Sequence, residues 1–315
     1  MREALTNEKF DTKVEPSDWR YSAAILGLYK YLDYYGEPGI DFEVSDDAIK
    51  FHLADITEDK YLKFVEFYYD DELQHKKLEQ LMQLEECSDE QMKLANELMK
   101  ANSILKKVFG KLKFDGTNQK EILELIYTNR NALIKETFRN KSNMYANYAN
   151  TGQLLEKGKE CCRLWGYYVD GGRKSKAIAY NFDVNTFVAQ DDILFDFIPF
   201  GFLGDRETFF LNDNYSVKQL IQTNREFEES IKNEVAASEG KSKDARKILF
   251  KTIQNASDFV DYDVEVIVKN REKAFYETLH IRKESIDILK KLEVYEPFCF
   301  SFKINENYYM NIEKE

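Results

Sequence analysis

The sequence has little of the side-chain chemistry on which most enzymes depend. It holds only three histidines, His52, His75 and His280, and they lie in unrelated segments. The motifs H-E-x-x-H, G-x-S-x-G, the Walker loop and G-x-G-x-x-G are all missing. Carboxylates are plentiful, but their convergence in space cannot be read from a sequence. The sequence therefore favours a binding protein over an enzyme, with no catalytic residue and no cofactor expected. His52 and His75 are expected at the surface or at the edge of a core.

Cysteine is also scarce, and its spacing excludes the common metal and disulfide frameworks. The four cysteines, Cys87, Cys161, Cys162 and Cys299, form no C-x-x-C pair. The adjacent Cys161 and Cys162 suit neither a disulfide nor a four-ligand zinc site. Their segment, KECCRLWGYYVDGGRKSKAIAYNFDV, looks like a zinc knuckle that has lost its ligands, with Trp165 where a second ligand would stand. No metal is expected, and reduced thiols in a cytosol fit best.

Long apolar runs are missing too. No stretch of 18 uncharged apolar residues exists, and the N-terminal MREALTNEKF has no signal-peptide hydrophobic region. A soluble, cytoplasmic protein without membrane contact is expected. A hydrophobic fraction of 43% with 14% aromatic residues excludes wholesale disorder, and 315 residues are long enough for two lobes.

The net charge of −12 is unevenly distributed. Residues 1–100 carry 24 Asp and Glu against 12 Lys and Arg, whereas residues 101–315 carry 33 of each. The acidic excess is therefore N-terminal, and the rest of the chain can present local basic patches. The three candidates are the stretch from Lys106 to Lys141, the GGRKSK segment 171–176, and KSKDARKILFK at 241–251. For each of them a solvated helix or loop face is the alternative.

Periodicity predicts an α+β protein with a boundary near residue 150. In a mainly helical, acidic N-terminal lobe (1–150), we expect a helix over 18–36 that is buried on more than one side. A hairpin around Ser45-Asp46-Asp47 follows, and then helical spacing from about Thr57 to Arg139. Within that spacing, Asp89-Glu90 is expected to open a helical run that ends near Gly110. The Asn-rich segment 140–153 is the predicted boundary or exposed loop.

The second lobe, residues 151–315, is predicted to mix strands and helices. Strands are expected at AIAYNFDV (177–184), FDFIPF (195–200), ETFFLN (207–212) and DVEVIVK (263–269). Helices are expected over 216–236, 243–255 and 283–292. This order is typical of an α+β lobe, and the loops of that lobe include the candidates for DNA contact.

The stretch FIPFGFLGDRETFFLNDNYSV, residues 197–217, is the most informative part of that lobe. It ends in Asn212-Asp213-Asn214, where a predicted strand meets a predicted helix. Asn and Asp are preferred helix caps. An amide also donates and accepts hydrogen bonds, so it can read a base edge. On chemistry alone both interpretations stay open. The GGRKSK turn is suited to following phosphates without reading bases.

Four segments stand in an order that points to one family. They are the W-x-Y-S-A-A-I-L-G-L-x-K-Y-L block that starts at Trp19, the cysteine-bearing segment before FDVNTF, the FIPFGF…ETFFLNDNYSVKQL…N stretch, and DFVDYDVEVIVKNREKAF. In this order, over most of residues 18–290, the chain resembles the large (Cas8-type) subunit of type I CRISPR interference complexes (Cascade), of subtype I-B or the related I-A. Two departures are the lone Cys161-Cys162 pair and the short chain after residue 292, where relatives often carry a helical bundle.

The resemblance implies a non-catalytic, RNA- and DNA-binding subunit in antiviral defence. Such a subunit recognises the protospacer-adjacent motif (PAM) in double-stranded DNA and aids duplex opening, while base pairing with the crRNA reads the rest of the target. The implied partners are the crRNA, Cas5-type, Cas7-type and small subunits, and a recruited helicase-nuclease. If the resemblance holds, six side chains are expected to contact DNA, because they are cationic or carry an amide: Arg173, Lys174, Lys176, Arg206, Asn212 and Asn214.

Two alternatives remain. The acidic charge and the amphipathic helices also suit a scaffold protein that has no nucleic-acid role. The many carboxylates leave a metal-dependent nuclease as the least favoured interpretation.

Overall fold

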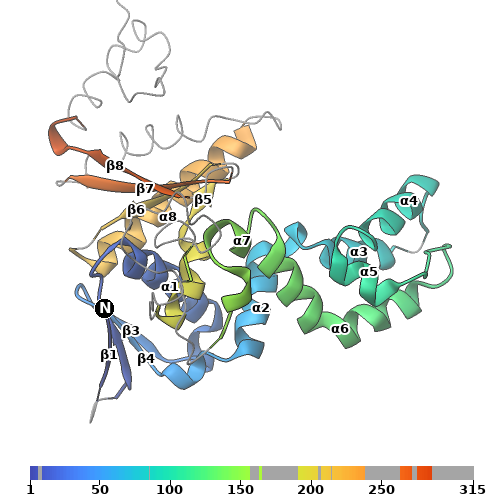
Figure 1. Ribbon diagram of the computed structural model, residues 1–315, viewed down its shortest axis with the longest axis horizontal. Helices are drawn as coiled ribbons and strands as arrows, with labels where there is room; N and C mark the ends of the chain where they lie inside the picture. The colour runs from blue at the N-terminus through green and yellow to red at the C-terminus, as the bar shows by residue number, and fades with distance from the viewer. Residues whose placement is uncertain are drawn as a thin grey trace, which may run out of the picture.

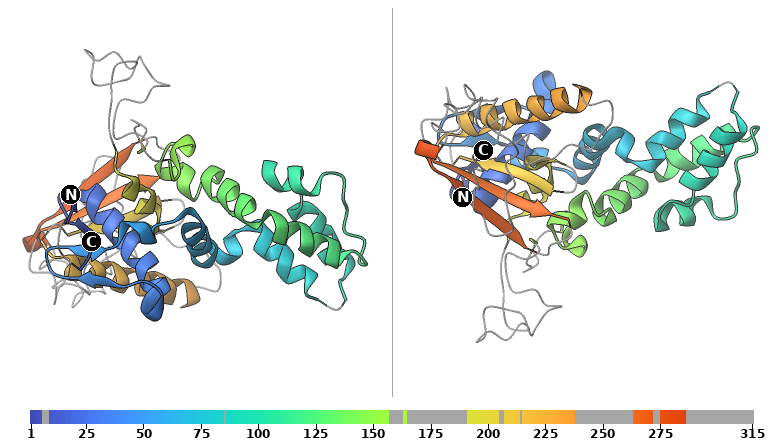
Figure 2. Two further views of the ribbon diagram at one scale, coloured as in Figure 1. Left: turned by 90° about the horizontal axis from the view of Figure 1, so that it is seen from below. Right: turned by 90° about the horizontal axis from the view of Figure 1, so that it is seen from above.

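The computed structural model describes residues 1–5, 9–84, 86–156, 163–164, 191–204, 207–213, 215–237, 263–271 and 275–285. The described residues form two parts that all three ribbon views separate (Figures 1 and 2). One is a body that contains both sheets. The other is an arm of four helices, residues 74–140, that projects away from the body. The predicted α+β class is confirmed.

Helix α1, Trp19–Gly39, forms the centre of the body. It starts where the sequence predicts, because the Asp18 carboxylate accepts a hydrogen bond from the Arg20 backbone N–H at 2.8 Å. The expected burial on more than one side is confirmed by apolar residues around the helix that are at most 2% exposed: Ala23, Ala24, Ile25, Leu26, Leu28, Tyr31 and Leu32. A helix that is apolar all round belongs inside a core.

The segment predicted as the strand FDFIPF lies against α1, and that prediction is wrong. It belongs to η5, a run of 3-10 helix over Ile193–Gly201. Every residue from Leu194 to Gly201 is buried, so the run shows no alternation that would separate a strand from a helix. Two glycines allow close backbone contact with α1. A Cβ on Gly27 would lie 2.0 Å from the Phe197 carbonyl oxygen, and a Cβ on Gly201 would lie 2.7 Å from that of Ala23.

The first sheet is small and antiparallel throughout. Its strands are β1 (Arg2–Ala4), β2 (Thr12–Val14), β3 (Phe42–Val44) and β4 (Ile49–Phe51), in the order β1-β2-β4-β3. The predicted hairpin is confirmed as β3 and β4, with Ser45 and Ala48 hydrogen-bonded across the turn. Strands β1 and β2 were not predicted, because these three-residue runs are not joined by a turn signal like the Ser45-Asp46-Asp47 that marks β3 and β4.

Helices cover most of the chain from residue 53 to residue 140. The helical spacing predicts them from about Thr57 to Arg139. They are η1 (Leu53–Asp55), α2 (Glu58–Tyr69), η2 (Asp70–Glu72), α3 (Gln74–Met82), α4 (Asp89–Leu98), α5 (Ser103–Phe109) and α6 (Gln119–Asn140). The run predicted from Asp89-Glu90 to Gly110 is two helices. Ser88 closes a capping box on α4, and Asn102 starts α5 by accepting a hydrogen bond from the Leu105 N–H.

The arm has its own hydrophobic core, separate from that of the body. Ile122, Ile126 and Leu133 of α6 pack with α3, α4 and α5, whereas Ile134 and Phe138 of the same helix join the body core. Helix α6 therefore connects the two parts. The body core also draws on both sides of residue 150. The division into lobes at that residue stays a prediction.

The Asn-rich segment 140–153 is not an exposed loop. It contains α7 (Tyr145–Tyr148) and η3 (Thr151–Gln153). Met144, Tyr145 and Tyr148 are at most 2% exposed, because their side chains pack into the body core. The many polar residues of this segment hid the hydrophobic pattern of these three buried side chains in the sequence.

The second sheet lies on the opposite side of α1 from the first sheet (Figure 1). Its antiparallel strands are β5 (Leu203–Gly204), β6 (Glu207–Asn212), β7 (Val264–Asn270) and β8 (Tyr276–Ile281), in that order, and α8 (Val217–Ala237) follows β6. The predictions for β6, β7 and α8 are confirmed. Phe210 and Ile267 pack into the body core, while Phe209 and Leu211 belong to a smaller core with Phe227 of α8. The predictions for 177–184 and 243–255, and most of 283–292, lie outside the described residues.

Candidate nucleic-acid interface

The junction between β6 and α8 shows what part of the Asn212–Asn214 stretch does. The Asp213 carboxylate is 3% exposed and accepts hydrogen bonds from the backbone N–H groups of Tyr215 at 2.7 Å and Ser216 at 3.2 Å. The Ser216 hydroxyl then accepts from the Gln219 N–H at 3.3 Å, in the first turn of α8. The helix-cap interpretation is therefore confirmed, and Asp213 and Ser216 provide the cap.

Asn212 is turned into the sheet. Its side-chain amide donates a hydrogen bond to the Glu265 carboxylate on β7, and the residue is 5% exposed. Its Oδ1 is buried and accepts no hydrogen bond from the described residues. A direct contact between Asn212 and a base would require this strand end to open. The role of Asn212 in DNA binding stays a prediction.

A second amide supports the same junction, and the sequence analysis did not single it out. Asn224 of α8 is 1% exposed, accepts a hydrogen bond from the Leu211 N–H at 3.2 Å and donates to the Leu211 carbonyl at 2.8 Å. It fixes the helix to the strand. The available signal was its position in the apolar stripe formed with Leu220, Ile221 and Phe227, because a polar residue on a buried face is normally hydrogen-bonded.

The other predicted DNA-contact residues, Arg173, Lys174, Lys176, Arg206 and Asn214, lie outside the described residues. The same holds for Cys161 and Cys162 and for the basic stretch 241–251. The contacts assigned to these positions stay predictions.

A buried ion pair anchors the chain just before the β5–β6 turn. Arg163 is 2% exposed, and its guanidinium donates to both carboxylate oxygens of Asp196, at 2.8 Å each. The Tyr145 hydroxyl and the Leu155 N–H donate to the same carboxylate, at 2.6 and 2.8 Å. Burial raises the pKa of Asp196 to about 6, although the Arg163 cation and these hydrogen bonds act in the opposite direction. Because these groups bind one another, the cluster stabilises the fold.

The histidines do not gather into a reactive site. His52 is half-exposed, with its Nδ1 3.6 Å from the Asp11 carboxylate, and His280 is exposed on β8. His75 is not at the surface: it is 1% exposed, with its Nε2 2.9 Å from the Glu66 carboxylate. The turn before α3 places His75 where the arm meets the body. The charged residues around His75 in the sequence did not indicate this burial. Within the described residues, no three His, Cys, Asp or Glu side chains are grouped to hold a metal ion.

The described parts of the molecule differ in net charge. Residues 1–73 carry 18 Asp and Glu against 8 Lys and Arg, whereas the arm, residues 74–140, carries 10 against 12. Of the three basic stretches that the sequence singles out, only that from Lys106 to Lys141 lies within the described residues. Its first lysines are exposed, and no ion pair joins them to another described residue: Lys106, Lys107, Lys111 and Lys113. The arm is therefore the described region best suited to meet phosphates.

The described structure is that of an α+β protein whose buried polar clusters support the fold and whose arm carries exposed lysines. The chain belongs to the family of CRISPR-associated protein Csx8, whose model matches residues 10–315. This membership confirms the CRISPR part of the resemblance seen in the sequence. Subtype I-B or I-A stays a prediction. No curated protein and no solved structure matches the chain significantly. None of the described helices is long and apolar enough to cross a membrane.

Proposed function

We propose that this chain is the non-catalytic large subunit of a type I CRISPR interference complex, that it recognises the PAM in double-stranded DNA, and that it aids duplex opening for crRNA pairing. The observation that carries the proposal is the family match over residues 10–315. A CRISPR-associated role implies work beside other Cas proteins and crRNA. The subtype, I-B or I-A, and the Cas5-type, Cas7-type and small subunits belong to the proposal.

The physical character of the described residues supports a binding role. Their buried charged and amide groups, such as Asp196, Arg163, Asp213 and Asn224, are held by contacts that shape the fold. The acidic residues 1–73 suit contacts with protein partners, since a phosphate backbone repels them. The basic side chains of the arm suit the nucleic acid.

Co-purification tests this proposal. The tagged chain is expressed together with its genomic neighbours, and the purified material is examined for partner proteins and RNA. We expect a complex that contains one small RNA of uniform length with a repeat-derived end. A clean protein without RNA or partners would overturn the proposal and favour the scaffold alternative.

A second measurement addresses catalysis and the nuclease alternative. The purified chain is incubated with labelled DNA and RNA in the presence of Mg²⁺ or Mn²⁺. We expect no cleavage. Metal-dependent cleavage that disappears when one carboxylate is substituted would contradict the non-catalytic role.

A further inference from the structure

The far end of the arm has the strongest run of positive charge in the described residues. Between residues 100 and 120 the chain has a single acidic residue, Asp115, and six lysines: Lys100, Lys106, Lys107, Lys111, Lys113 and Lys120. All six lysines are exposed. No ion pair joins any of them to another described residue, whereas Lys135 and Arg130, nearer the body, are paired with Glu58, Glu66 and Glu79.

The loop that carries Lys111 and Lys113 is held by its own hydrogen bonds. Asn96 of α4 donates to the Phe114 carbonyl at 3.0 Å and accepts from the Phe114 N–H at 3.0 Å. Asn118 donates to the Lys113 carbonyl at 2.9 Å. The Phe114 side chain is buried in the arm core. The backbone under these lysines is therefore ordered before any ligand binds, which lowers the entropy cost of binding.

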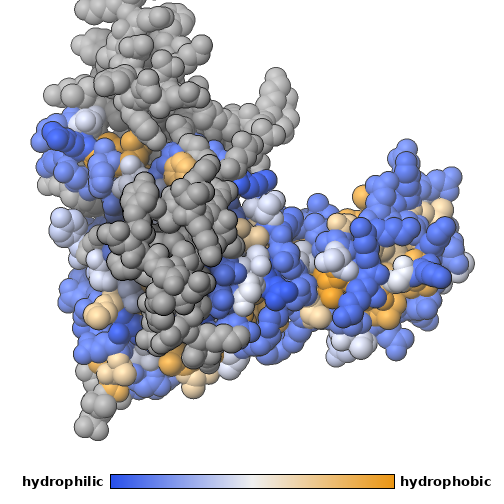
Figure 3. Space-filling view, viewed as in Figure 1, coloured by the Kyte–Doolittle hydropathy of each residue, from blue (hydrophilic) through white to orange (hydrophobic). Residues whose placement is uncertain are grey.

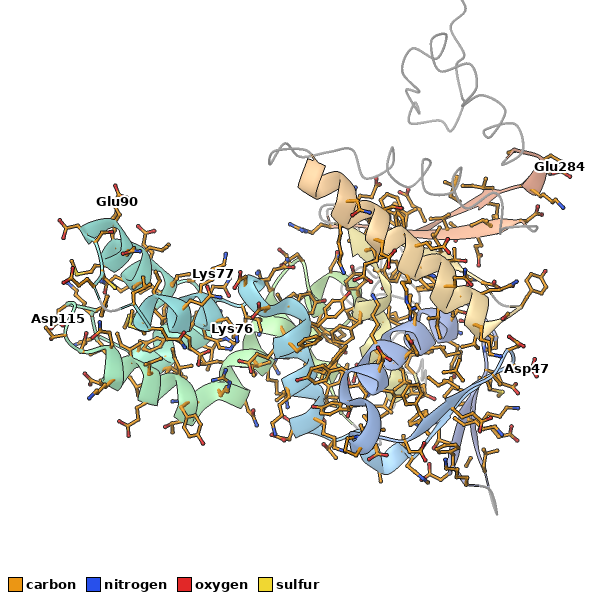
Figure 4. The ribbon with its side chains drawn as sticks, turned by 180° about the vertical axis from the view of Figure 1, so that it is seen from behind. Asp47, Lys76, Lys77, Glu90, Asp115 and Glu284 are labelled. Atoms are coloured by element: carbon orange, nitrogen blue, oxygen red, sulfur yellow. The ribbon has the colours of Figure 1, made fainter. Side chains whose placement is uncertain are left out.

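The one acidic residue of this segment, Asp115, forms no ion pair with these lysines among the described residues. The Asp115 carboxylate accepts hydrogen bonds from the backbone N–H and the hydroxyl of Thr117, at 2.9 and 2.8 Å. The acidic start of α4 lies on a different edge of the arm: Figure 4 places Glu90 at the top of the arm's end and Asp115 below it. The start of α4 and Asp115 therefore lie apart at the end of the arm (Figure 4).

We propose that this surface, residues 100–120 at the end of the arm, binds the phosphodiester backbone of a nucleic acid, with Lys106, Lys107, Lys111 and Lys113 as its main contacts. Exposed ammonium groups at this density neutralise phosphates and release the counterions condensed on them, without reading sequence. Base reading stays with other parts of the chain. The inference rests on the proposed function, and it adds a location and a contact chemistry to it.

Two pairs of neighbouring lysines on the arm allow a matched test. The test variant is Lys106→Gln with Lys107→Gln, at the end of α5. The control is Lys76→Gln with Lys77→Gln on α3, well away from Asp115 (Figure 4). A second test variant, Lys111→Gln with Lys113→Gln, changes the loop and leaves the last turn of α5 intact. All variants are studied in the assembled complex, and circular dichroism verifies that each one folds.

The readout is the dependence of binding on salt. Affinity for a labelled DNA duplex of about 30 base pairs, and for a single-stranded RNA, is measured across a range of salt concentrations. Each lost phosphate contact lowers the log–log slope by about 0.9 for duplex and about 0.7 for a single strand. We expect each test variant to lower the slope by about 1 to 2 and the control to leave it unchanged. The probe with the larger change identifies which nucleic acid lies on the arm.

Other results would overturn the inference and leave the proposed function in place. One is a wild-type complex whose affinity for DNA depends steeply on salt concentration, with both test variants showing the same salt dependence. Another is a test variant that loses a protein subunit from the complex but keeps the wild-type slope, which would assign the lysines to an acidic protein partner. Failure of the wild-type chain to assemble with RNA and partners would instead overturn the proposed function itself.

Discussion

The body and the arm are stabilised in different ways. The body core is a network of aromatic rings from distant segments. In it, Phe200 lies 4.9 Å from Phe64 and 5.7 Å from Phe138, and Tyr61 lies 5.2 Å from Phe197, measured between ring centroids. The arm core is mostly aliphatic and comes from one continuous stretch of chain. Figure 3 shows hydrophobic residues among the hydrophilic ones on the surface of the arm. Local contacts make the arm a region that can lose structure by itself.

The two parts also differ in charge, and these differences are compatible with the division of roles proposed above. The N-terminal part of the body is strongly acidic, and the end of the arm is basic. A body with an acidic N-terminal part is suited to assembly with protein partners. A projecting arm with a basic end is suited to reach a nucleic acid. The following predictions test this comparison, from the largest expected effect to the smallest.

Gly27→Ala should prevent stable folding of the body. The new Cβ would lie 2.0 Å from the Phe197 carbonyl oxygen, and a backbone atom cannot move away without displacing η5 from α1. We expect a loss of more than about 4 kcal/mol, measured by chemical denaturation. Gly39→Ala in the same helix is the control, since its Cβ would meet only the Tyr35 Cβ at 3.7 Å. Equal stability of both variants would show that α1 and η5 are not packed this closely.

Ile126→Ala should destabilise the arm without affecting the body. Ile126 is 0% exposed in the arm core, and truncation of such a side chain costs about 2–5 kcal/mol. Hydrogen exchange should become faster in α3, α4 and α5 and stay slow in β6 and β7. The half-buried neighbour Leu125 provides the control variant, Leu125→Ala. Equal acceleration in the sheet would mean that arm and body unfold as one unit.

Glu66→Gln should weaken the connection between arm and body. The Glu66 carboxylate lies 2.9 Å from the His75 ring and 2.9 Å from the Arg130 guanidinium, which also binds Glu79. We expect a loss of about 2 kcal/mol near neutral pH. Burial opposes ionisation of Glu66, but His75 and Arg130 outweigh burial and hold its pKa below the usual value of 4.5. The stabilisation is therefore complete above pH 4.5 and is lost as the pH falls through the lower, folded-state pKa.

Denaturation of both proteins across this pH range checks that sign. The difference between wild type and Glu66→Gln should shrink on acidification. A difference that grows instead would contradict it. Glu58→Gln is the matched control, because the Glu58 side chain is 54% exposed in its pair with Lys135. Removal of such a surface pair costs at most about 1 kcal/mol.

Lys269→Met should have the smallest effect over one pH unit, and one that depends on pH. Lys269 lies on β7, and burial lowers its pKa from 10.5 to about 8. Between these values the unfolded chain holds the proton more tightly than the folded chain does, so this residue makes stability rise with pH. Relative to Lys269→Met, the wild type should gain about 1.4 kcal/mol for each pH unit between pH 8 and pH 10.5. The exposed Lys218→Met is the control. A parallel pH profile for wild type and Lys269→Met would refute the burial effect.

The sequence predicts those elements whose signals are local. Helix α1 has an Asp18 cap and an apolar surface, β6 and β7 are apolar runs bounded by turns, and α8 follows the polar cap at Asp213 and Ser216. Each of these features can be read within about one turn or one strand of the element itself.

The errors have tertiary causes. The η5 segment is buried by α1 together with rings of α2 and α6, so its composition did not distinguish a strand from a 3-10 helix. Residues 140–153 contain buried tyrosines whose partners are far away in the chain. The ion pair of Arg163 with Asp196 joins residues 33 positions apart, and no local pattern relates them.

The candidate site was only partly within reach of sequence reasoning. The basic stretch that begins at Lys106 was identified, but the exposure of its lysines, their lack of ion pairs among the described residues and their position on a projecting arm follow from the fold. In the case of Asn212, residue chemistry proposed a base contact; the structure shows a hydrogen bond to Glu265, and the base contact stays a prediction. Residue type indicates which contacts are possible, and packing decides which of them are made.

Hydrogen exchange of the assembled complex, with and without target DNA, tests the division of roles most directly. The account predicts that target binding slows exchange in residues 100–120 at the arm's end and leaves the acidic residues 1–73 unchanged. Assembly with the protein partners should instead slow exchange in residues 1–73. Slower exchange in residues 1–73 on DNA binding, with no change in residues 100–120, would contradict the central claim.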